Sequence, residues 1–372
     1  MQFKNVVGQA VLKERLIHEV RSQKISHAQL FLGKPGHGGL SLALAFVQYL
    51  FCDQPSDNDS CGTCPSCRKV TELQHPDLHF SFPVVQAINK TSDPFLADWR
   101  EQIKATLYFD LYGWTQRIDP KERKPIIGTQ ESQEIIRKLS LKSFEGGYKV
   151  MLIWMAEEMN KDCSNKLLKI LEEPPAKTLF ILLAEQQDKL LPTILSRTQL
   201  VHVPRIEHAD LEFFIKQNHA LGTEKSDSIL SRSSGDVLTA IQLVAEENEE
   251  HTYHALFVNM MRVCYKKDVI AMLDWAEEIG VFGKEYQKGY LTYALHMFRQ
   301  SMLRNYTNDQ LTQVSSDEAS FLTNFSRFIS GKNLMDFNTA FNSAHFHVDR
   351  NASPKILFTE LCFKVMRYIH FA

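Results

Sequence analysis

Residues 29–40 read Gln29-Leu30-Phe31-Leu32-Gly33-Lys34-Pro35-Gly36-His37-Gly38-Gly39-Leu40, an apolar run followed by a glycine-rich loop. Its apolar start predicts a buried strand, and the apolar segment that follows at 41–51 predicts a helix. Strand, glycine-rich loop and helix are the surroundings of a phosphate-binding loop, in which backbone N–H groups hold the phosphates. A glycine-rich turn with no connection to nucleotides is the alternative interpretation.

The loop lacks two residues that phosphate chemistry requires. A working loop has a lysine that neutralises the distal phosphates and then a serine or threonine that holds magnesium. Gly39 and Leu40 stand at those two positions, and Lys34, at the second loop position, is predicted to point away from the phosphates. We expect a loop that keeps its shape through its glycines but gives no ATP binding and no ATPase activity of its own. These glycines are Gly33, Gly36, Gly38 and Gly39.

Other positions of an ATPase site are altered as well. A later buried strand ends in Trp154, where an active enzyme has an Asp-Glu pair. Glu157 and Glu158 lie beyond that strand end and are predicted to be solvated helix residues. The next buried strand ends in Ala184 rather than a polar residue, and Leu238 takes the place of a phosphate-contacting arginine. All of these positions lack the residues of an active ATPase site, so they support the same conclusion as the glycine loop.

Four of the seven cysteines fall within sixteen positions, at Cys52, Cys61, Cys64 and Cys67. Short gaps with turn-forming residues between them let four thiolates converge on one ion, and a closed tetrahedral shell is typical of structural zinc. The sequence therefore predicts a structural zinc site. An iron–sulfur cluster and four free thiols are the alternatives.

The order of predicted elements indicates an α/β domain followed by helices. Helical patterns at 131–141 and 163–173 alternate with buried strands at 149–154 and 179–183, which predicts a doubly wound parallel sheet. From about residue 206 onward the apolar spacing is almost uniformly helical.

Length and charge limit the classes of function. A chain of 372 residues is too long for one hydrophobic core, so two or three domains are expected. The 42 basic and 44 acidic residues create no global field that favours nucleic acid or an anionic membrane. The chain has neither an apolar run of about 20 residues nor a signal-peptide pattern at its start, so we expect a cytoplasmic protein with no membrane partner.

Several motifs together resemble one family, the delta-prime subunits of the bacterial DNA polymerase III clamp loader, within the AAA+ ATPases. The resemblance covers roughly residues 3–245, and the rest agrees only in length and helical character. It rests on His27-Ala28, the four-cysteine insertion, His75-Pro76-Asp77, Gly146-Gly147-Tyr148-Lys149-Val150, Asn165-Lys166-Leu167-Leu168-Lys169-Ile170-Leu171-Glu172-Glu173-Pro174-Pro175 and Leu195-Ser196-Arg197-Thr198.

The resemblance implies three domains. An AAA+ nucleotide-binding-like domain would occupy 1–205, with the zinc module at 52–67 inserted in it. A small helical lid domain would follow at 206–250, and an all-α collar domain for oligomerisation would take 251–372.

The resemblance also implies a function. Delta-prime is a non-hydrolysing member of a hetero-pentameric ring that loads the sliding clamp onto primed DNA, so the partners would be other loader subunits, the clamp and primer-template DNA. Through the complex the chain would belong to the DNA polymerase III holoenzyme. Arg197, in a Ser-Arg-Cys motif whose cysteine is Thr198 here, would act as an arginine finger on a neighbour's ATP; a surface arginine at an element end is the alternative.

Two other functions remain open from the residues. One is an active ATP-hydrolysing motor subunit of the same loader, against which Gly39, Leu40 and Trp154 argue. The other is a standalone zinc-dependent DNA-binding protein. A basic face formed by Arg137, Lys138 and Lys142 is compatible with contact to DNA phosphates or with a solvated surface.

One segment, 85–124, is longer than this family leads us to expect, and it is rich in aromatic residues. We consider base stacking and an insertion that packs its own aromatic cluster. The aromatic residues are Phe95, Trp99, Tyr108, Phe109, Tyr112 and Trp114.

Overall fold

The computed structural model describes residues 1–121, 123–218, 223–246, 253–307, 314 and 316–370. The chain divides into two compact units, 1–214 with 235–239 and 215–234 with 240–372. The division into three domains stays a prediction, and its boundary between residues 250 and 251 lies outside the described residues.

Within the described residues, the first unit is built on one parallel sheet. The order across the sheet is β2-β3-β4-β1-β5, and all neighbouring strands are parallel. β1, β3 and β4 are buried at every residue, because helices cover both faces of the sheet. The strands are β1 (Ala28–Leu32), β2 (Leu78–Ser81), β3 (Lys149–Ile153), β4 (Thr178–Ala184) and β5 (Gln199–His202).

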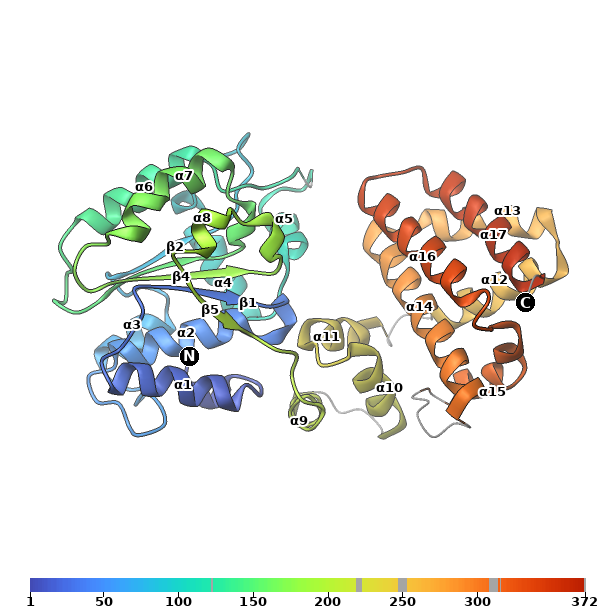
Figure 1. Ribbon diagram of the computed structural model, residues 1–372, viewed down its shortest axis with the longest axis horizontal. Helices are drawn as coiled ribbons and strands as arrows, with labels where there is room; N and C mark the ends of the chain where they lie inside the picture. The colour runs from blue at the N-terminus through green and yellow to red at the C-terminus, as the bar shows by residue number, and fades with distance from the viewer. Residues whose placement is uncertain (122, 219–222, 247–252, 308–313, 315, 371–372) are drawn as a thin grey trace. The chain divides into compact units, whose positions relative to one another are not determined.

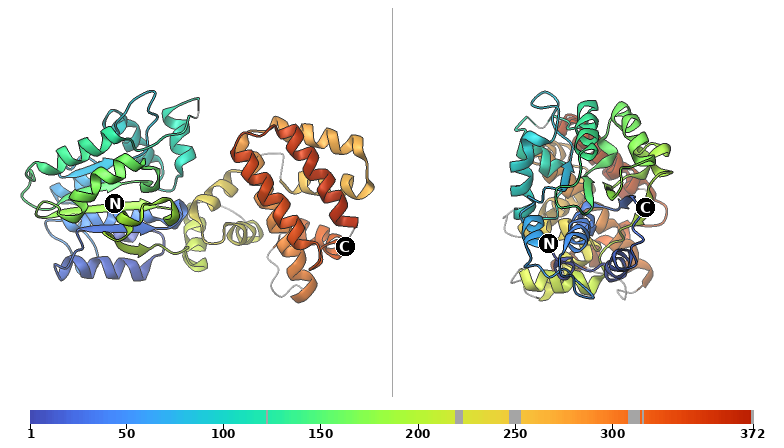
Figure 2. Two further views of the ribbon diagram at one scale, coloured as in Figure 1. Left: turned by 45° about the horizontal axis from the view of Figure 1, so that its top comes forward. Right: turned by 90° about the vertical axis from the view of Figure 1, so that its left-hand side faces the viewer.

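Helices cover both faces of this sheet, as a doubly wound fold requires (Figure 1). One face carries α1 (Ala10–Arg21), α2 (Gly39–Phe51) and α3 (Pro65–Thr71); the other carries α6 (Thr129–Ser140), α7 (Lys161–Glu172) and α8 (Pro192–Leu195). Figure 2 shows the dark blue α1 and the green helices on opposite sides of the strands. The predicted α/β core is thus confirmed, although β2 and β5 were not predicted.

α2 lies at the centre of the first unit. Residues 40–49 of this helix are buried without exception, so it has no solvent face. α7 shows how local sequence sets the bounds: the Asn160 side chain accepts a hydrogen bond from the Cys163 N–H at 2.8 Å, and Pro174 and Pro175 follow the helix end. Glu172 and Glu173 therefore form a structural helix end, as predicted.

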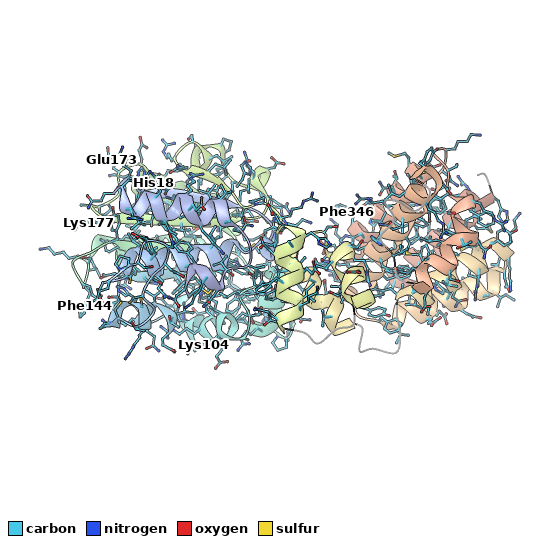
Figure 3. All side chains as sticks on the ribbon, turned by 90° about the horizontal axis from the view of Figure 1, so that it is seen from below. His18, Lys104, Phe144, Glu173, Lys177 and Phe346 are labelled. Atoms are coloured by element: carbon cyan, nitrogen blue, oxygen red, sulfur yellow. The ribbon has the colours of Figure 1, made fainter. Side chains whose placement is uncertain are left out.

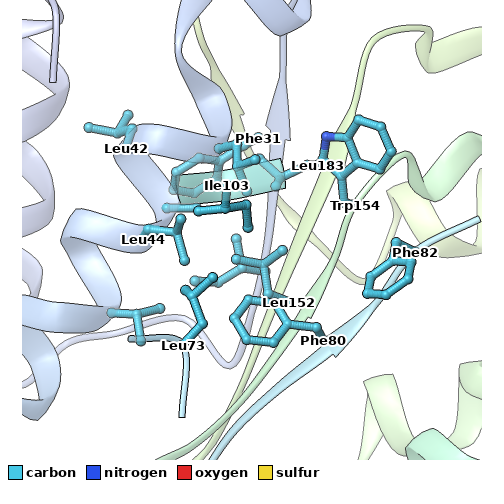
Figure 4. Packing of buried hydrophobic residues seen from close by; sticks show 14 of the residues in the cluster. Phe31, Leu42, Leu44, Leu73, Phe80, Phe82, Ile103, Leu152, Trp154 and Leu183 are labelled. Carbon is cyan, nitrogen blue, oxygen red and sulfur yellow. The ribbon is translucent and has the colours of Figure 1, made fainter. Parts of the chain in front are cut away.

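The aromatic insertion folds into η3 (Asp93–Phe95), α4 (Leu96–Ala105) and α5 (Leu111–Ile118). The Trp99 ring is fully buried; it stacks on Phe82 at 4.3 Å and meets Trp114 edge-on at 5.2 Å. Figure 4 shows Ile103 of α4 among side chains of the sheet. An aromatic cluster forms as predicted, but it joins the main core, and buried rings cannot stack on bases. Glu122, within the predicted 85–124 segment, lies outside the described residues.

The remaining elements are helical, as predicted. α14 packs against α16, and α17 packs against α12, α13 and α16, around buried rings such as Phe257, Trp275 and Phe298. None of the helices in the described ranges is both long enough and apolar enough to span a bilayer. The helices are α9 (His208–Asn218), α10 (Thr223–Ser233), α11 (Val237–Glu246), α12 (Tyr253–Lys266), α13 (Val269–Val281), α14 (Lys284–Thr307), α15 (Ser316–Phe325), α16 (Leu334–Asp349) and α17 (Pro354–His370).

Candidate functional site

A pocket lies where the carboxyl ends of β1, β4 and β3 meet, the usual place for a ligand in an open α/β sheet. β1 contributes the glycine loop, β3 contributes Trp154 and Met155, and β4 contributes Ala184 and Glu185. The space that remains is about 30 Å³. The three segments that an ATPase uses are therefore brought together, but they enclose little room.

The predicted glycines shape the turn between β1 and α2. Gly33 lies so close to β5 that a Cβ atom there would be 2.4 Å from the Val203 carbonyl oxygen. A Cβ atom on Gly36 would be 1.8 Å from a carboxylate oxygen of Asp236. Only glycine fits at Gly33, where backbone is the obstacle, whereas a side chain at Gly36 would displace the Asp236 carboxylate. Gly38 and Gly39 complete the turn and begin α2.

The electrostatics of the pocket oppose a phosphate. Gly39 and Leu40 occupy the first turn of α2, where the lysine and the hydroxyl would stand. Burial raises the pKa of the Glu185 carboxyl. The nearby charges of Asp110 and Asp236 raise this pKa further, whereas the charge of Lys34 lowers it. A carboxyl, Glu185, thus lines the pocket beside Lys34, where an ATPase collects positive charge.

The prediction for Glu157 and Glu158 is wrong. They lie in the short 3-10 helix η4 (Ala156–Glu158), but they are half-buried rather than solvated. Glu157 Oε1 accepts hydrogen bonds from the backbone N–H groups of Glu185 at 2.7 Å and Gln186 at 3.3 Å. Met155, in the left-handed conformation at φ 53°, turns the chain between β3 and η4. This carboxylate holds the backbone in place.

The four predicted metal ligands come together. The sulfur atoms of Cys52, Cys61, Cys64 and Cys67 all lie within 4.8 Å of one another. Four sulfurs at about 2.3 Å from one ion would be about 3.8 Å apart, close to the 3.9 Å between the sulfurs of Cys61 and Cys67. The four-cysteine cluster could therefore hold a metal ion.

Backbone amides prepare the cluster for thiolates. The N–H groups of Thr63 and Cys64 lower the pKa of the Cys61 thiol to about 6, because they favour its charged form. The Cys67 N–H points at the Cys64 sulfur at 3.4 Å, and the Cys61 N–H points at the Cys52 sulfur at 3.2 Å. None of the seven cysteines, all of which are among the described residues, forms a disulfide.

The His75-Pro76-Asp77 motif joins this module to the sheet. The His75 ring stacks on Phe51 at 4.1 Å, and its Nε2 lies 3.1 Å from a carboxylate oxygen of Glu145. Asp77 accepts hydrogen bonds from the N–H groups of Phe144 and Glu145 at 2.7 and 2.9 Å. The Phe144 side chain itself is exposed at the surface (Figure 3). The motif is therefore structural.

The predicted arginine finger lies outside the pocket. Arg197 follows α8, and its guanidinium contacts a carboxylate oxygen of Glu172, the last residue of α7, at 2.9 and 3.2 Å. It also donates a hydrogen bond to the Thr193 carbonyl at 3.1 Å. With 30% of its side chain exposed, the group is held in place but accessible.

The basic face on α6 is weaker than its sequence suggested. Arg137 pairs with Glu134 at 2.7 Å, and Lys138 pairs with Asp93 of the insertion. Two of the three positive charges are therefore neutralised locally, and a solvated surface fits better than a DNA site.

Sequence reasoning missed Asp110 and Asp236 beside the pocket. Asp236 lies two residues before Leu238, the residue that stands in place of the arginine. Its carboxylate accepts a hydrogen bond from the Thr239 N–H at 2.9 Å at the start of α11. Helix-capping patterns of Asp before an apolar run predict such contacts, but they give no indication that the cap lies against the glycine loop.

Comparisons with known proteins give three kinds of match. Residues 8–207 match the family model described as "DNA polymerase III, delta subunit". Two curated relatives, both named DNA polymerase III subunit delta', are 28% identical over 187 residues in Escherichia coli K12 and 31% identical over 184 residues in Bacillus subtilis 168. Each alignment covers 50% of this chain. It covers 45% of the Escherichia coli protein and 44% of the Bacillus subtilis protein, so this chain spans less than half the length of either relative.

Among solved structures, a gamma subunit-related protein from Thermotoga maritima aligns with a TM-score of 0.43 and 16% identity, covering 95% of this chain and 99% of the other. The resemblance to delta-prime subunits is confirmed by the curated relatives. Because the family model covers more than half of the 372 residues, the chain belongs to the DNA polymerase III delta subunit family.

Proposed function

We propose that this chain is a delta-prime-type subunit of the DNA polymerase III clamp loader that does not hydrolyse ATP and assists neighbours that do. It would take its place in a ring of loader subunits in the cytoplasm and help to load the sliding clamp onto primed DNA. The names of the relatives, delta' and tau, support the placement in this machinery.

One observation carries the proposal: the pocket at the strand ends keeps the glycine loop but has exchanged its chemistry. Gly39, Leu40 and Trp154 replace the cation, the hydroxyl and the acid of an ATPase. Hydrolysis requires positive charge near the distal phosphates, and β4 brings a carboxyl, Glu185, to the pocket rather than a cation. An active motor subunit finds no support in these residues.

We assign the role of arginine finger in trans to Arg197. Its contacts with Glu172 and Thr193 fix the guanidinium at the surface, and a fixed guanidinium can approach a partner's γ-phosphate. For arginine fingers in general, this stabilisation changes the rate by about 10³–10⁵. The exposed fraction of the side chain supports the assignment.

We assign structural zinc to the four cysteines. Four protein sulfurs close the coordination shell, which leaves no position for a reacting water. When bound, the ion would fix the 52–67 segment beside α2 and α3.

The test of Arg197 is reconstitution of the full chain with loader subunits of the same organism. Arg197→Ala should leave assembly unchanged by size-exclusion chromatography, and it should lower DNA-stimulated ATP turnover by roughly tenfold or more, because one active site loses its finger.

The matched control is Arg137→Ala, since Arg137 is also an exposed arginine paired with a glutamate. This variant should turn over ATP at the rate of the unaltered complex. If both variants turn over ATP normally, Arg197 is not a finger. If the isolated chain hydrolyses ATP, the non-hydrolysing role is wrong.

A further inference from the structure

The loop between the two insertion helices reaches the glycine loop. α4 ends at Ala105 and α5 begins at Leu111, and the residues between them include Leu107, Tyr108 and Phe109. Leu107 and Phe109 line the pocket at the strand ends. We call these two side chains the plug.

The plug fills the space beside the end of β3. The Phe109 ring lies 4.9 Å from the Trp154 ring and 5.6 Å from the Trp99 ring, and only 5% of its surface is exposed. Trp154 and Leu183, both pocket residues, lie side by side in Figure 4. The space of about 30 Å³ has room for a few water molecules and not for a triphosphate.

Tyr108 and the insertion helices fix the plug. The Tyr108 ring lies 3.5 Å from the position that a Cβ atom on Gly38 would take, and 6.2 Å from the Phe214 ring. Asp110 accepts a hydrogen bond from the Gly113 N–H at 2.8 Å, which begins α5, and the Trp114 indole donates to the Pro83 carbonyl at 2.8 Å. A loop held at these points does not leave the pocket without breaking buried contacts.

We propose that Leu107 and Phe109 are specificity-determining residues that exclude nucleoside triphosphates from this subunit by occupying the pocket, independently of the missing lysine and hydroxyl. The inference rests on the proposed non-hydrolysing function and adds a steric cause to it. The insertion thereby gains a role: it closes the glycine loop and ties it to the core.

The test separates steric exclusion from lost chemistry in the full chain, with a fluorescent ATP analogue and Mg²⁺ as the probe. Gly39→Lys with Leu40→Thr restores the loop chemistry, and a Cβ atom on Gly39 would be 3.4 Å from Leu183, an ordinary contact. We expect no binding by the unaltered chain or by this restored variant. Adding Leu107→Ala and Phe109→Ala to the restored variant should produce binding, with a dissociation constant about tenfold or more below the highest concentration at which the restored variant shows none.

The matched control adds Phe95→Ala to the restored variant. Phe95 is an insertion phenylalanine buried to a similar degree, at 8% exposed against 5%, but it does not line the pocket. This control should bind no better than the restored variant. Where the Phe109 substitution prevents folding, as judged by circular dichroism, Leu107→Ala alone on the restored loop gives the same comparison, because Leu107 is only half-buried.

Three outcomes would overturn the proposal. Binding by the restored variant as tight as that of the opened one would show that lost chemistry alone excludes nucleotide, and the non-hydrolysing function would stand. A folded, opened variant that binds nothing would show that the plug is not the barrier. Binding of the analogue by the unaltered chain, if followed by hydrolysis, would refute the proposed function as well.

Discussion

At the scale of single residues, burial decides the charge state of several groups near the sheet. His79 in β2 has its pKa lowered to about 4, mainly because burial disfavours its charged form and also because Lys138 lies near. Burial likewise lowers the pKa of His75. The side chains of both histidines are therefore mainly uncharged at neutral pH.

This environment of His79 predicts a loss of stability in mild acid. The unfolded histidine takes up a proton near pH 6.5 and the folded one near pH 4, so stability falls as the pH is lowered through this window. Between pH 7 and 5.5 His79 should account for about 1 kcal/mol of unfolding free energy, after allowance for its partial exposure. Urea unfolding of the unaltered chain and of His79→Gln at both pH values measures this difference. Equal losses in the two proteins would contradict it.

At the scale of elements, one cysteine of the cluster that could hold a metal ion is also a helix cap. Cys64 is the N-cap of α3, where its sulfur accepts from the Cys67 N–H, and Pro65 is the first residue of the helix. The same side chain would thus begin the helix and bind the ion.

The two roles of Cys64 can be separated with serine, which is a good helix cap but a poor zinc ligand. Cys64→Ser should lower the zinc content from about one per chain to well below one and lower the melting temperature. The control is Cys163→Ala, which removes a buried thiol outside the cluster. Plasma emission spectrometry of protein purified without chelators gives the zinc content. Full zinc content in Cys64→Ser would refute four-sulfur ligation.

The predictability of each element depended on the strength of its pattern. β1, β3 and β4 are buried on both faces, so each appears in the sequence as a continuous apolar run. β2 and β5 have only four residues, and three residues of β5 are exposed, so no apolar run marks them.

The candidate sites show the same limit. The cysteines and the glycine loop were predictable because their spacing carries the chemistry. The plug was not, because only tertiary packing brings Leu107 and Phe109 to a loop about seventy residues earlier in the chain. Aromatic content predicted a cluster, but it did not predict which pocket the cluster would close.

At the scale of the whole chain, charge separates a ring subunit from a standalone DNA-binding protein. The net charge is −2, and two of the three basic residues that could contact DNA, Arg137 and Lys138 of α6, are paired with acids. Affinity for DNA comes largely from release of counterions by unpaired lysines and arginines. A chain whose positive and negative charges nearly cancel should contribute to DNA binding mainly as part of a complex.

The isolated full chain should therefore bind a primed template only weakly, with a dissociation constant no tighter than about 10⁻⁵ M at 0.15 M salt, in the range of non-specific binding. Fluorescence anisotropy with labelled primer-template DNA at 0.05 and 0.2 M salt measures the affinity and its salt dependence. The reconstituted loader provides the comparison, since it should bind the same DNA far more tightly when ATP is present. A different result would favour a zinc-dependent DNA-binding protein: the isolated chain binds DNA tightly and in a salt-dependent way, and a folded Cys64→Ser variant loses this binding. The cysteine module would then contact DNA rather than support the fold.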